Sequence, residues 1–292
     1  MGVILRQQHS IAKTVSVTGF GYWSGEDVRI EFRPAEPDTG IVFVRGDLTP
    51  PIRIEATVER RIEMSRRTTL AKAGIAVEMV EHILAALAGL QVDNCEIWTD
   101  RPEMPGCDGS SLPFVEALFK AGIVSQQARR QVRRIGHAVR VGDGQSWVEA
   151  RPTVLPHPLL RYQLDYGTNS AIGRQELDVA LTPETFASHL AAARTFLLQA
   201  EAEWMRSRGL GRRVSYQDVL VFNCQGPLHN RLRFADECVR HKALDLVGDL
   251  ALAGCDLLGE FVAYRSGHRL NAELVRTLLA GDATCQPWRP CA

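Results

Sequence analysis

The chain has 292 residues, of which 45% are hydrophobic and 23% are charged. This balance is typical of a globular protein with two modest domains or one large one. Lys plus Arg and Asp plus Glu each total 34, so the formal net charge is zero. A nucleic-acid-binding protein usually has a basic excess, so we expect no nucleic-acid partner.

Neither a membrane segment nor a disulfide framework is indicated. The sequence has no run of about 18 apolar residues, the length that a transmembrane helix needs. The first residues lack the apolar core and cleavage site of a signal peptide. The seven cysteines are an odd number and form no CxxC pair, which fits a reducing compartment. We therefore expect a cytoplasmic protein without stable membrane insertion.

The first part of the chain alternates short apolar runs with Gly, Pro and Asp, the pattern of strands and turns. In AVEMVEHILAALAGL, Val77, Val80, Leu84 and Leu87 recur at helical spacing, and Gly89 is a common stop signal. The predicted elements are strands at His9–Val17, Asp27–Phe32, Ile41–Val44 and Ile52–Ala56, a helix within residues 76–90, a strand at Asn94–Thr99 and a helix at Leu112–Ala121.

A polar, basic stretch at Ser125–Arg134 shows no apolar periodicity and is interpreted as a linker between two domains. The elements predicted after it are strands at Ala138–Val141, Ser146–Ala150, Leu160–Tyr166, Gln175–Ala180, Asp218–Phe222 and Gly259–Tyr264, and helices at Pro183–Ala192, Gln199–Arg208, Asp236–Ala253 and Ala272–Leu279. Both halves contain several strands plus helices, which favours an α+β fold over a doubly wound sheet. No internal sequence repeat is evident, so duplication is suggested by element order alone.

The long helix of the second half carries a stripe of ionisable residues. Its members are Glu237, His241, Asp245 and Asp249, spaced four apart. Side chains four apart share one helix face, so His241 and Asp245 are close enough to bind one metal ion. Zinc accepts this ligand chemistry. The alternative is a solvated helix face, the more common reason for such a stripe. Apolar residues on the flanks favour burial, and buried carboxylates need partners.

Three other short segments carry possible catalytic groups. Glu81 and His82 adjoin in the first helix, as a possible general base and third metal ligand, although a surface pair is the commoner meaning of this dipeptide. His268 follows a predicted strand in a loop, where it would act as an acid or bond only to backbone. Thr195 offers a hydroxyl, but its segment alone is uninformative.

Taken together, these segments resemble a known family. VEHILAALAGL, PEMPGCDGSSLPFV, ARTF, RSRGLG, LRFADECVRHKALDLVGDL and SGHRLN occur in this order over nearly the whole chain. They are similar to the UDP-3-O-acyl-N-acetylglucosamine deacetylases of lipid A biosynthesis in Gram-negative-type bacteria. The resemblance implies zinc-dependent removal of an N-acetyl group. It also implies two similar α+β domains, each with a layer of strands and two helices, and an active site between them. The linker predicted above places these domains at 1–127 and 128–292.

The resemblance assigns a role to each candidate residue. It implies that the zinc ligands are His82, His241 and Asp245, and that Glu81 is the general base. His268, held by Asp249, is the second acid/base or charge-stabilising group, and Thr195 assists the oxyanion. The residues implied in substrate binding are Lys242, Phe196 and Tyr166, the last by stacking on uracil, together with an insert near residues 197–222 that forms an acyl passage.

The chain also departs from this family. Its segment GFGYWSG has Tyr22 and Trp23 where Leu and His are usual, and GRRVSYQ brings Arg212 and Arg213. Two alternatives therefore stand beside the deacetylase: a zinc amidohydrolase for another acylated nucleotide sugar, and an inactive relative that binds nucleotide sugar or lipid. In each case the partner is a small molecule, and we expect a monomer.

Overall fold

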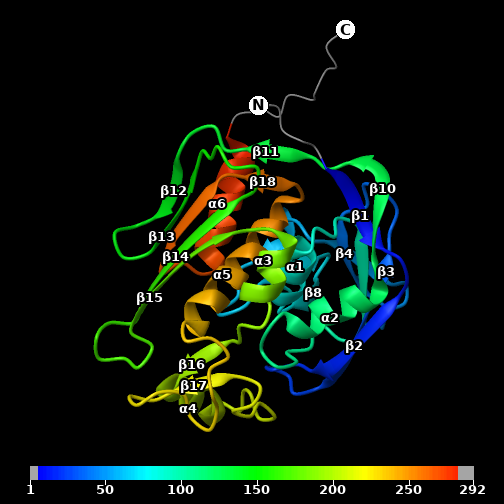
Figure 1. Ribbon diagram of the computed structural model, residues 1–292. Helices are drawn as coiled ribbons and strands as arrows, with labels where there is room; N and C mark the ends of the chain where they lie inside the picture. Colours follow the sequence, from blue (N-terminus) through cyan, green and yellow to red (C-terminus); the bar gives the residue numbers. More distant parts are fainter. Residues whose placement is uncertain (1–5, 282–292) are drawn as a thin grey trace.

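The computed structural model describes residues 6–281, and its main body contains two five-stranded sheets with helices between them (Figure 1). The first sheet has the strand order β2-β3-β9-β4-β5. Its strands are β2 (Val15–Phe20), β3 (Asp27–Pro34), β4 (Ile41–Arg45), β5 (Ile52–Glu55) and β9 (Cys95–Thr99), accompanied by α1 (Glu81–Gly89) and α2 (Leu112–Ala121).

The second sheet has the order β12-β13-β19-β14-β15. Its strands are β12 (Val139–Gly142), β13 (Trp147–Arg151), β14 (Leu159–Asp165), β15 (Arg174–Ala180) and β19 (Glu260–Tyr264), accompanied by α5 (Glu237–Leu250) and α6 (His268–Ala280). In both sheets the central strand is parallel to one neighbour, and every other pairing is antiparallel. In both units one helix precedes the central strand and one follows it. The two units are therefore similar, and the α+β prediction is confirmed.

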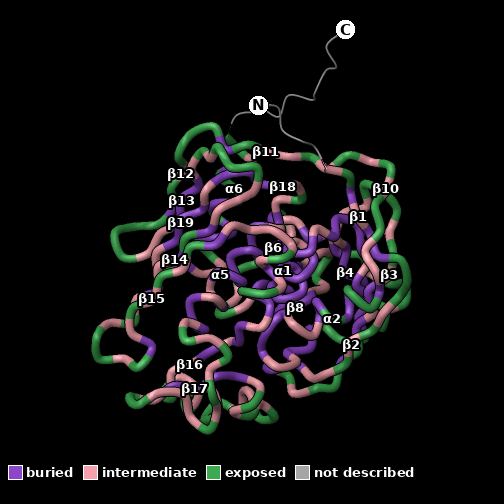
Figure 2. The backbone as a smooth tube through the Cα atoms, viewed as in Figure 1, coloured by how far each residue is buried: buried purple, intermediate pink, exposed green. Residues whose placement is uncertain are grey.

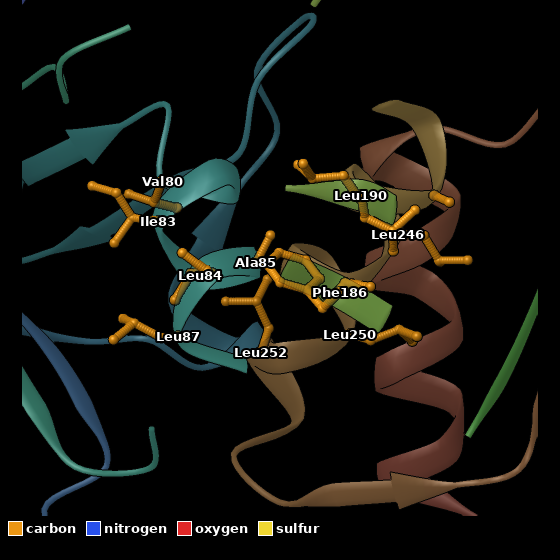
Figure 3. Packing of buried hydrophobic residues seen from close by; sticks show 14 of the residues in the cluster. Val80, Ile83, Leu84, Ala85, Leu87, Phe186, Leu190, Leu246, Leu250 and Leu252 are labelled. Carbon is orange, nitrogen blue, oxygen red and sulfur yellow. The ribbon is translucent and has the colours of Figure 1, made fainter. Parts of the chain in front are cut away.

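The core lies where the helices of the two units meet. α1 and α5 pack against each other in the centre of the molecule (Figure 1). Ala85 of α1 lies next to Phe186 of the second unit (Figure 3). The buried residues concentrate in this central region and on the inner sides of the sheets, whereas exposed residues predominate at the periphery (Figure 2).

Two glycines permit the close approach of α1 to the second unit. A Cβ atom on Gly248 would lie 2.2 Å from the carbonyl oxygen of Glu81, and one on Gly89 would lie 2.2 Å from the ring of Phe186. Any larger residue at these positions would require the segments to separate, so Gly248 sets the distance between α1 and α5, and Gly89 sets the distance between α1 and the segment of Phe186.

The remaining elements are short. They are β1 (Gln7–Ile11), a 3₁₀ turn (Val58–Arg60), β6 (Arg61–Ile62), β7 (Thr69–Lys72), β8 (Ile75–Glu78), β10 (Ile123–Arg129), β11 (Val132–Arg134), α3 (Pro183–Thr185), a π-helical turn (Phe186–Leu190), β16 (Phe196–Leu198), α4 (Gln199–Ser207), β17 (Leu220–Phe222), a 3₁₀ turn (Ala251–Ala253) and β18 (Asp256–Leu258). The segment β16–α4–β17 forms a separate projection at the bottom of Figure 1. Among residues 6–281, no helix combines the length and apolarity needed to cross a membrane.

The linker prediction at 125–134 is wrong as a description of local structure. β10 covers residues 123–129 and pairs with β1, while β11 pairs in parallel with β18. β10 belongs to a two-stranded ribbon in which none of its own residues is fully buried, so it lacks the apolar face that would reveal a strand. The proposed domain boundary at residue 127 falls within this strand and stays a prediction.

The starts of two helices also differ from expectation. Residues 75–78, including Val77, form the strand β8, and α1 begins only at Glu81. Met79 between them has a φ of +59°, which ends the strand before the helix starts. At the other end of the chain, α6 begins at His268, so this histidine is the first helical residue and does not lie in a loop.

Candidate active site

A cleft of about 1060 Å³ brings nearly all the predicted site residues together. Its lining includes Glu81, His82, Tyr166, Thr195, Phe196, His241, Lys242, Asp245 and His268. Asp249 lies directly behind His268 and is fully buried. Residues from α1 of the first unit thus face residues from α5 and α6 of the second.

Three of these residues form a group suited to one metal ion. The possible ligand atoms of His82, His241 and Asp245 lie within 4.8 Å of one another, and all three residues are buried. Asp245 Oδ1 is 3.4 Å from His241 Nε2 and 3.7 Å from His82 Nε2. This carboxylate oxygen is buried and has no hydrogen-bond partner. A buried orphan acceptor is costly unless a cation satisfies it. The donor set of two imidazoles and a carboxylate therefore fits a catalytic zinc site.

The surroundings keep these ligand groups in the form that binds a metal. Burial lowers the pKa of His82 to about 3 and also lowers the pKa of His241, so both rings are neutral. The carbonyl oxygen of Ala193 accepts a hydrogen bond from His241 Nδ1 at 3.1 Å, which leaves Nε2 with its lone pair. Although burial favours a neutral Asp245, the ammonium of Lys242, 2.8 Å from Oδ2, helps hold the Asp245 pKa well below its usual range.

Glu81 lies at the start of α1, beside the ligand group. Its Oε2 accepts a hydrogen bond from the backbone N–H of Thr68 at 2.9 Å. Burial raises the pKa of Glu81 to about 7, because the site disfavours a charged carboxylate. A carboxyl group with a pKa near neutrality accepts and releases protons readily, as a general base must.

His268 and Asp249 form a second charged pair. His268 Nδ1 lies 2.8 Å from Asp249 Oδ2, which also accepts a hydrogen bond from Asn271 Nδ2 at 2.8 Å. Thr68 Oγ1 donates to the other oxygen of Asp249 at 2.6 Å. Burial disfavours the charged imidazole, but Asp249 outweighs it and raises the pKa of His268 to about 9. His268 is therefore an imidazolium at neutral pH. The alternative of a loop histidine that bonds only to backbone is wrong.

The stripe on α5 is likewise not a solvated face. Its members Glu237, His241, Asp245 and Asp249 are all buried, at 4% exposure or less. Each has a specific partner or belongs to the possible metal group. The burial of these residues thus excludes the solvated helix face. The spacing of the residues alone could not distinguish between the two interpretations.

The remaining predicted residues lie between the possible metal group and the projecting segment β16–α4–β17. Thr195 Oγ1 is 3.3 Å from His241 Nε2 and donates to Gly109 O at 3.0 Å. The Phe196 ring lies 6.1 Å from His241 and 5.9 Å from Tyr166, between centroids. Beyond Phe196, the cleft is lined by Leu197, Met205, Leu210, Val214, Val219 and Val221.

Several contacts in the site were not predicted from the sequence. Thr68 and Asn271 hold Asp249 from two other elements, and Thr68 also holds Glu81. Tyr22, one of the departures from the family pattern, lines the cleft and lies 2.9 Å from the carbonyl oxygen of Asp218. Arg213 pairs with Asp27 outside the metal group. A Thr or Asn carries no pattern that marks it as a partner, so only the fold reveals these residues.

Comparison with known proteins agrees with this geometry. The family model LpxC, described as UDP-3-O-acyl N-acetylglycosamine deacetylase, matches residues 8–280. Proteins named UDP-3-O-acyl-N-acetylglucosamine deacetylase are similar over most of the chain. The protein of Haemophilus influenzae (strain PittEE) is 38% identical over 280 residues, covering 94% of this chain and 91% of its own. That of Solibacter usitatus is 38% identical over 279 residues, covering 95% and 92%. That of Shewanella sp. (strain W3-18-1) is 39% identical over 276 residues, covering 94% and 90%. The chain belongs to the LpxC family of deacetylases.

Proposed function

We propose that the protein hydrolyses the N-acetyl group of a UDP-3-O-acyl-N-acetylglucosamine in lipid A biosynthesis, with one zinc ion held by His82, His241 and Asp245. The observation that carries this proposal is the buried, unpartnered Oδ1 of Asp245 between two neutral histidines, next to the carboxyl group of Glu81. The products are acetate and the free amine of the UDP-3-O-acyl-glucosamine.

A zinc ion held by these three residues would supply Lewis-acid activation of the attacking water and of the amide carbonyl. Glu81 then removes the proton from the attacking water. Its raised pKa suits this role, because a base with a pKa near the working pH also returns the proton efficiently. The hydrogen bond from the Thr68 N–H fixes one carboxyl oxygen, so the other is the one that accepts the proton.

Negative charge develops on the amide oxygen as water attacks. Thr195 Oγ1, beside His241, is placed to turn its one proton from the Gly109 carbonyl toward that oxygen. The imidazolium of His268 adds a positive charge in the same cleft and holds a proton that the leaving amine requires. Either Glu81 or His268 is suited to deliver this proton.

The rest of the cleft fits the two ends of the substrate. The apolar side chains from the segment 197–222 suit a fatty acyl chain, with Phe196 at the entrance of the passage. Tyr166 is 38% exposed and offers a ring face for uracil, while the ammonium of Lys242 suits polar oxygens of the substrate. We propose a cytoplasmic, monomeric enzyme for this small-molecule substrate.

Acetate release from the acylated UDP-sugar, measured with and without a zinc chelator, tests the proposal. We expect activity that the chelator abolishes and added zinc restores. Turnover of a different acylated nucleotide sugar in preference to this one would favour the alternative amidohydrolase. A protein that binds the substrate but neither binds zinc nor releases acetate would be the inactive relative.

A further inference from the structure

A buried ion pair lies one helical turn before His241, and the proposed reaction does not use it. Glu237, in the first turn of α5, has a side chain with 0% exposure, and the side chain of Arg194 is 5% exposed. Removing two charges from water costs several kcal/mol per ion, roughly, and the attraction between them often only offsets this cost. Stability alone is therefore a weak explanation for this pair.

The pair fixes both the side chain and the backbone of Arg194. Glu237 Oε1 accepts from Arg194 Nε at 2.7 Å and from the Arg194 backbone N–H at 3.1 Å. Its Oε2 accepts from Arg194 Nη2 at 3.2 Å and from the backbone N–H of Arg233 at 2.6 Å. The guanidinium further donates to Asn230 Oδ1 at 3.1 Å and to Arg231 O at 2.7 Å. Residue 194 is thus tied rigidly to the start of α5.

The residues on either side of Arg194 contact His241. The carbonyl oxygen of Ala193 accepts from His241 Nδ1 at 3.1 Å, and Thr195 Oγ1 lies 3.3 Å from His241 Nε2. The Thr195 backbone N–H donates to Gly109 O at 2.7 Å. Because Glu237 and His241 are both on α5, the ion pair connects the segment 193–195 to the same helix that carries the histidine.

We propose that Arg194 and Glu237 are positioning residues for metal binding. By holding residue 194 against α5, the pair keeps the Ala193 carbonyl aligned with Nδ1 of His241 and so directs Nε2 toward Asp245. Partners that orient a metal-binding histidine affect metal affinity by roughly 10- to 100-fold. The pair acts through one intervening carbonyl, so we expect an effect near the lower end of this range. This inference rests on the proposed zinc site.

The test measures zinc dissociation constants by chelator competition for the wild type, Glu237→Gln and Arg194→Lys. Glu237→Gln keeps the size of the side chain and loses its charge. Arg194→Lys keeps the charge and loses the planar fork that bonds Glu237 at two nitrogens. We expect zinc binding to weaken about tenfold in each variant. Near-UV circular dichroism shows which variants are folded, and the zinc affinity of either folded variant tests the proposal.

A matched control separates positioning from general stability. Asp93, whose side chain is 3% exposed, pairs with Arg6 and Arg130 outside the cleft. Asp93→Asn should lower the melting temperature without changing zinc affinity. Zinc affinities within twofold of wild type in the folded Glu237 and Arg194 variants, or an equal loss in Asp93→Asn, would overturn the inference. If the wild type itself bound no zinc, or if His241→Ala bound it normally, the proposed zinc site would fail instead.

Discussion

The pair His268–Asp249 leads to a specific expectation for the pH dependence of activity. Asp249 overcomes the effect of burial and raises the pKa of His268 to about 9, against an ordinary value of 6.5. If the imidazolium is the working form, activity falls as the pH rises through about 9 and His268 loses its proton. Asp249→Asn removes the carboxylate but keeps a side chain of the same shape. Burial then lowers the pKa of His268, because no carboxylate stabilises the charged ring.

The size of the effect follows from the raised pKa. Each pKa unit corresponds to about 1.4 kcal/mol, so the folded protein favours the imidazolium by about 3 kcal/mol relative to the ordinary value. We expect the alkaline limb of kcat/KM for acetate release to move by about two pH units or more toward acid in Asp249→Asn. His268→Gln, which carries no charge at any pH, should lose much of its rate and lack this limb. His137→Gln changes an exposed histidine and should leave the profile unaltered.

Stability gives an independent readout of the same pair. Because the pKa of His268 is raised on folding, its contribution to the free energy of unfolding is fully present below about pH 6.5 and is lost as the pH rises through about 9. Urea unfolding of the metal-free protein across this range should show the loss in the wild type but not in His268→Gln. An unchanged alkaline limb in both Asp249→Asn and His268→Gln, at near-normal rate, would refute the reasoning.

Four further predictions concern the metal group, the base, the acyl passage and the helix contact. His241→Ala should bind far less than one zinc per chain by elemental analysis, and an unchanged content would remove His241 from the ligands. Glu81→Ala should keep its zinc and lose about a hundred- to ten-thousandfold in kcat, whereas a loss of only a few-fold would point to another base. The 3-O-acylated substrate should exceed its deacylated analogue in kcat/KM by orders of magnitude, because each buried methylene contributes about 0.8 kcal/mol, and equal values would exclude an acyl passage. Gly248→Ala should lower the free energy of unfolding by about 1–3 kcal/mol because its Cβ would meet the Glu81 carbonyl, whereas Gly136→Ala, in open space, should not.

The fold was predictable where apolar periodicity is strong. The helices α2 and α5 and the strands of both main sheets except β2 were found at nearly their observed positions, because each has a face that packs on the core. The single strand predicted at His9–Val17 is wrong: this segment contains the end of β1, a break in the strand and the start of β2, which belong to different sheets. The exposed ribbon β10 was missed, since nothing in its polar sequence requires a strand until β1 lies beside it. The common strand order of the two units was not predictable either, because non-local pairing leaves no mark in the spacing of residues.

The candidate site was predictable in a similarly uneven way. The spacing of four residues placed His241 near Asp245, because one helical turn fixes that distance. Nothing in the spacing related His82 to them, since 159 positions separate it from His241 and the resemblance to a family supplied the link. The sequence also left open whether the stripe was buried. That question depends on which face of α5 meets α1, and only the assembled helices answer it.

The contact between α1 and α5 explains how residues of both units come together in the candidate site. Each unit contributes the helix that precedes its central strand, and the two helices meet where Gly248 faces the carbonyl oxygen of Glu81. That contact brings Glu81 and His82, the first residues of α1, beside Asp245. Asp245 lies about one turn before Gly248 in α5. The proposed base and one proposed ligand thus come from one unit, and the other two proposed ligands come from the other. Neither helix alone carries all the residues of the proposed site. The proposed chemistry therefore depends on the short distance between α1 and α5, which Gly248 allows because it has no side chain.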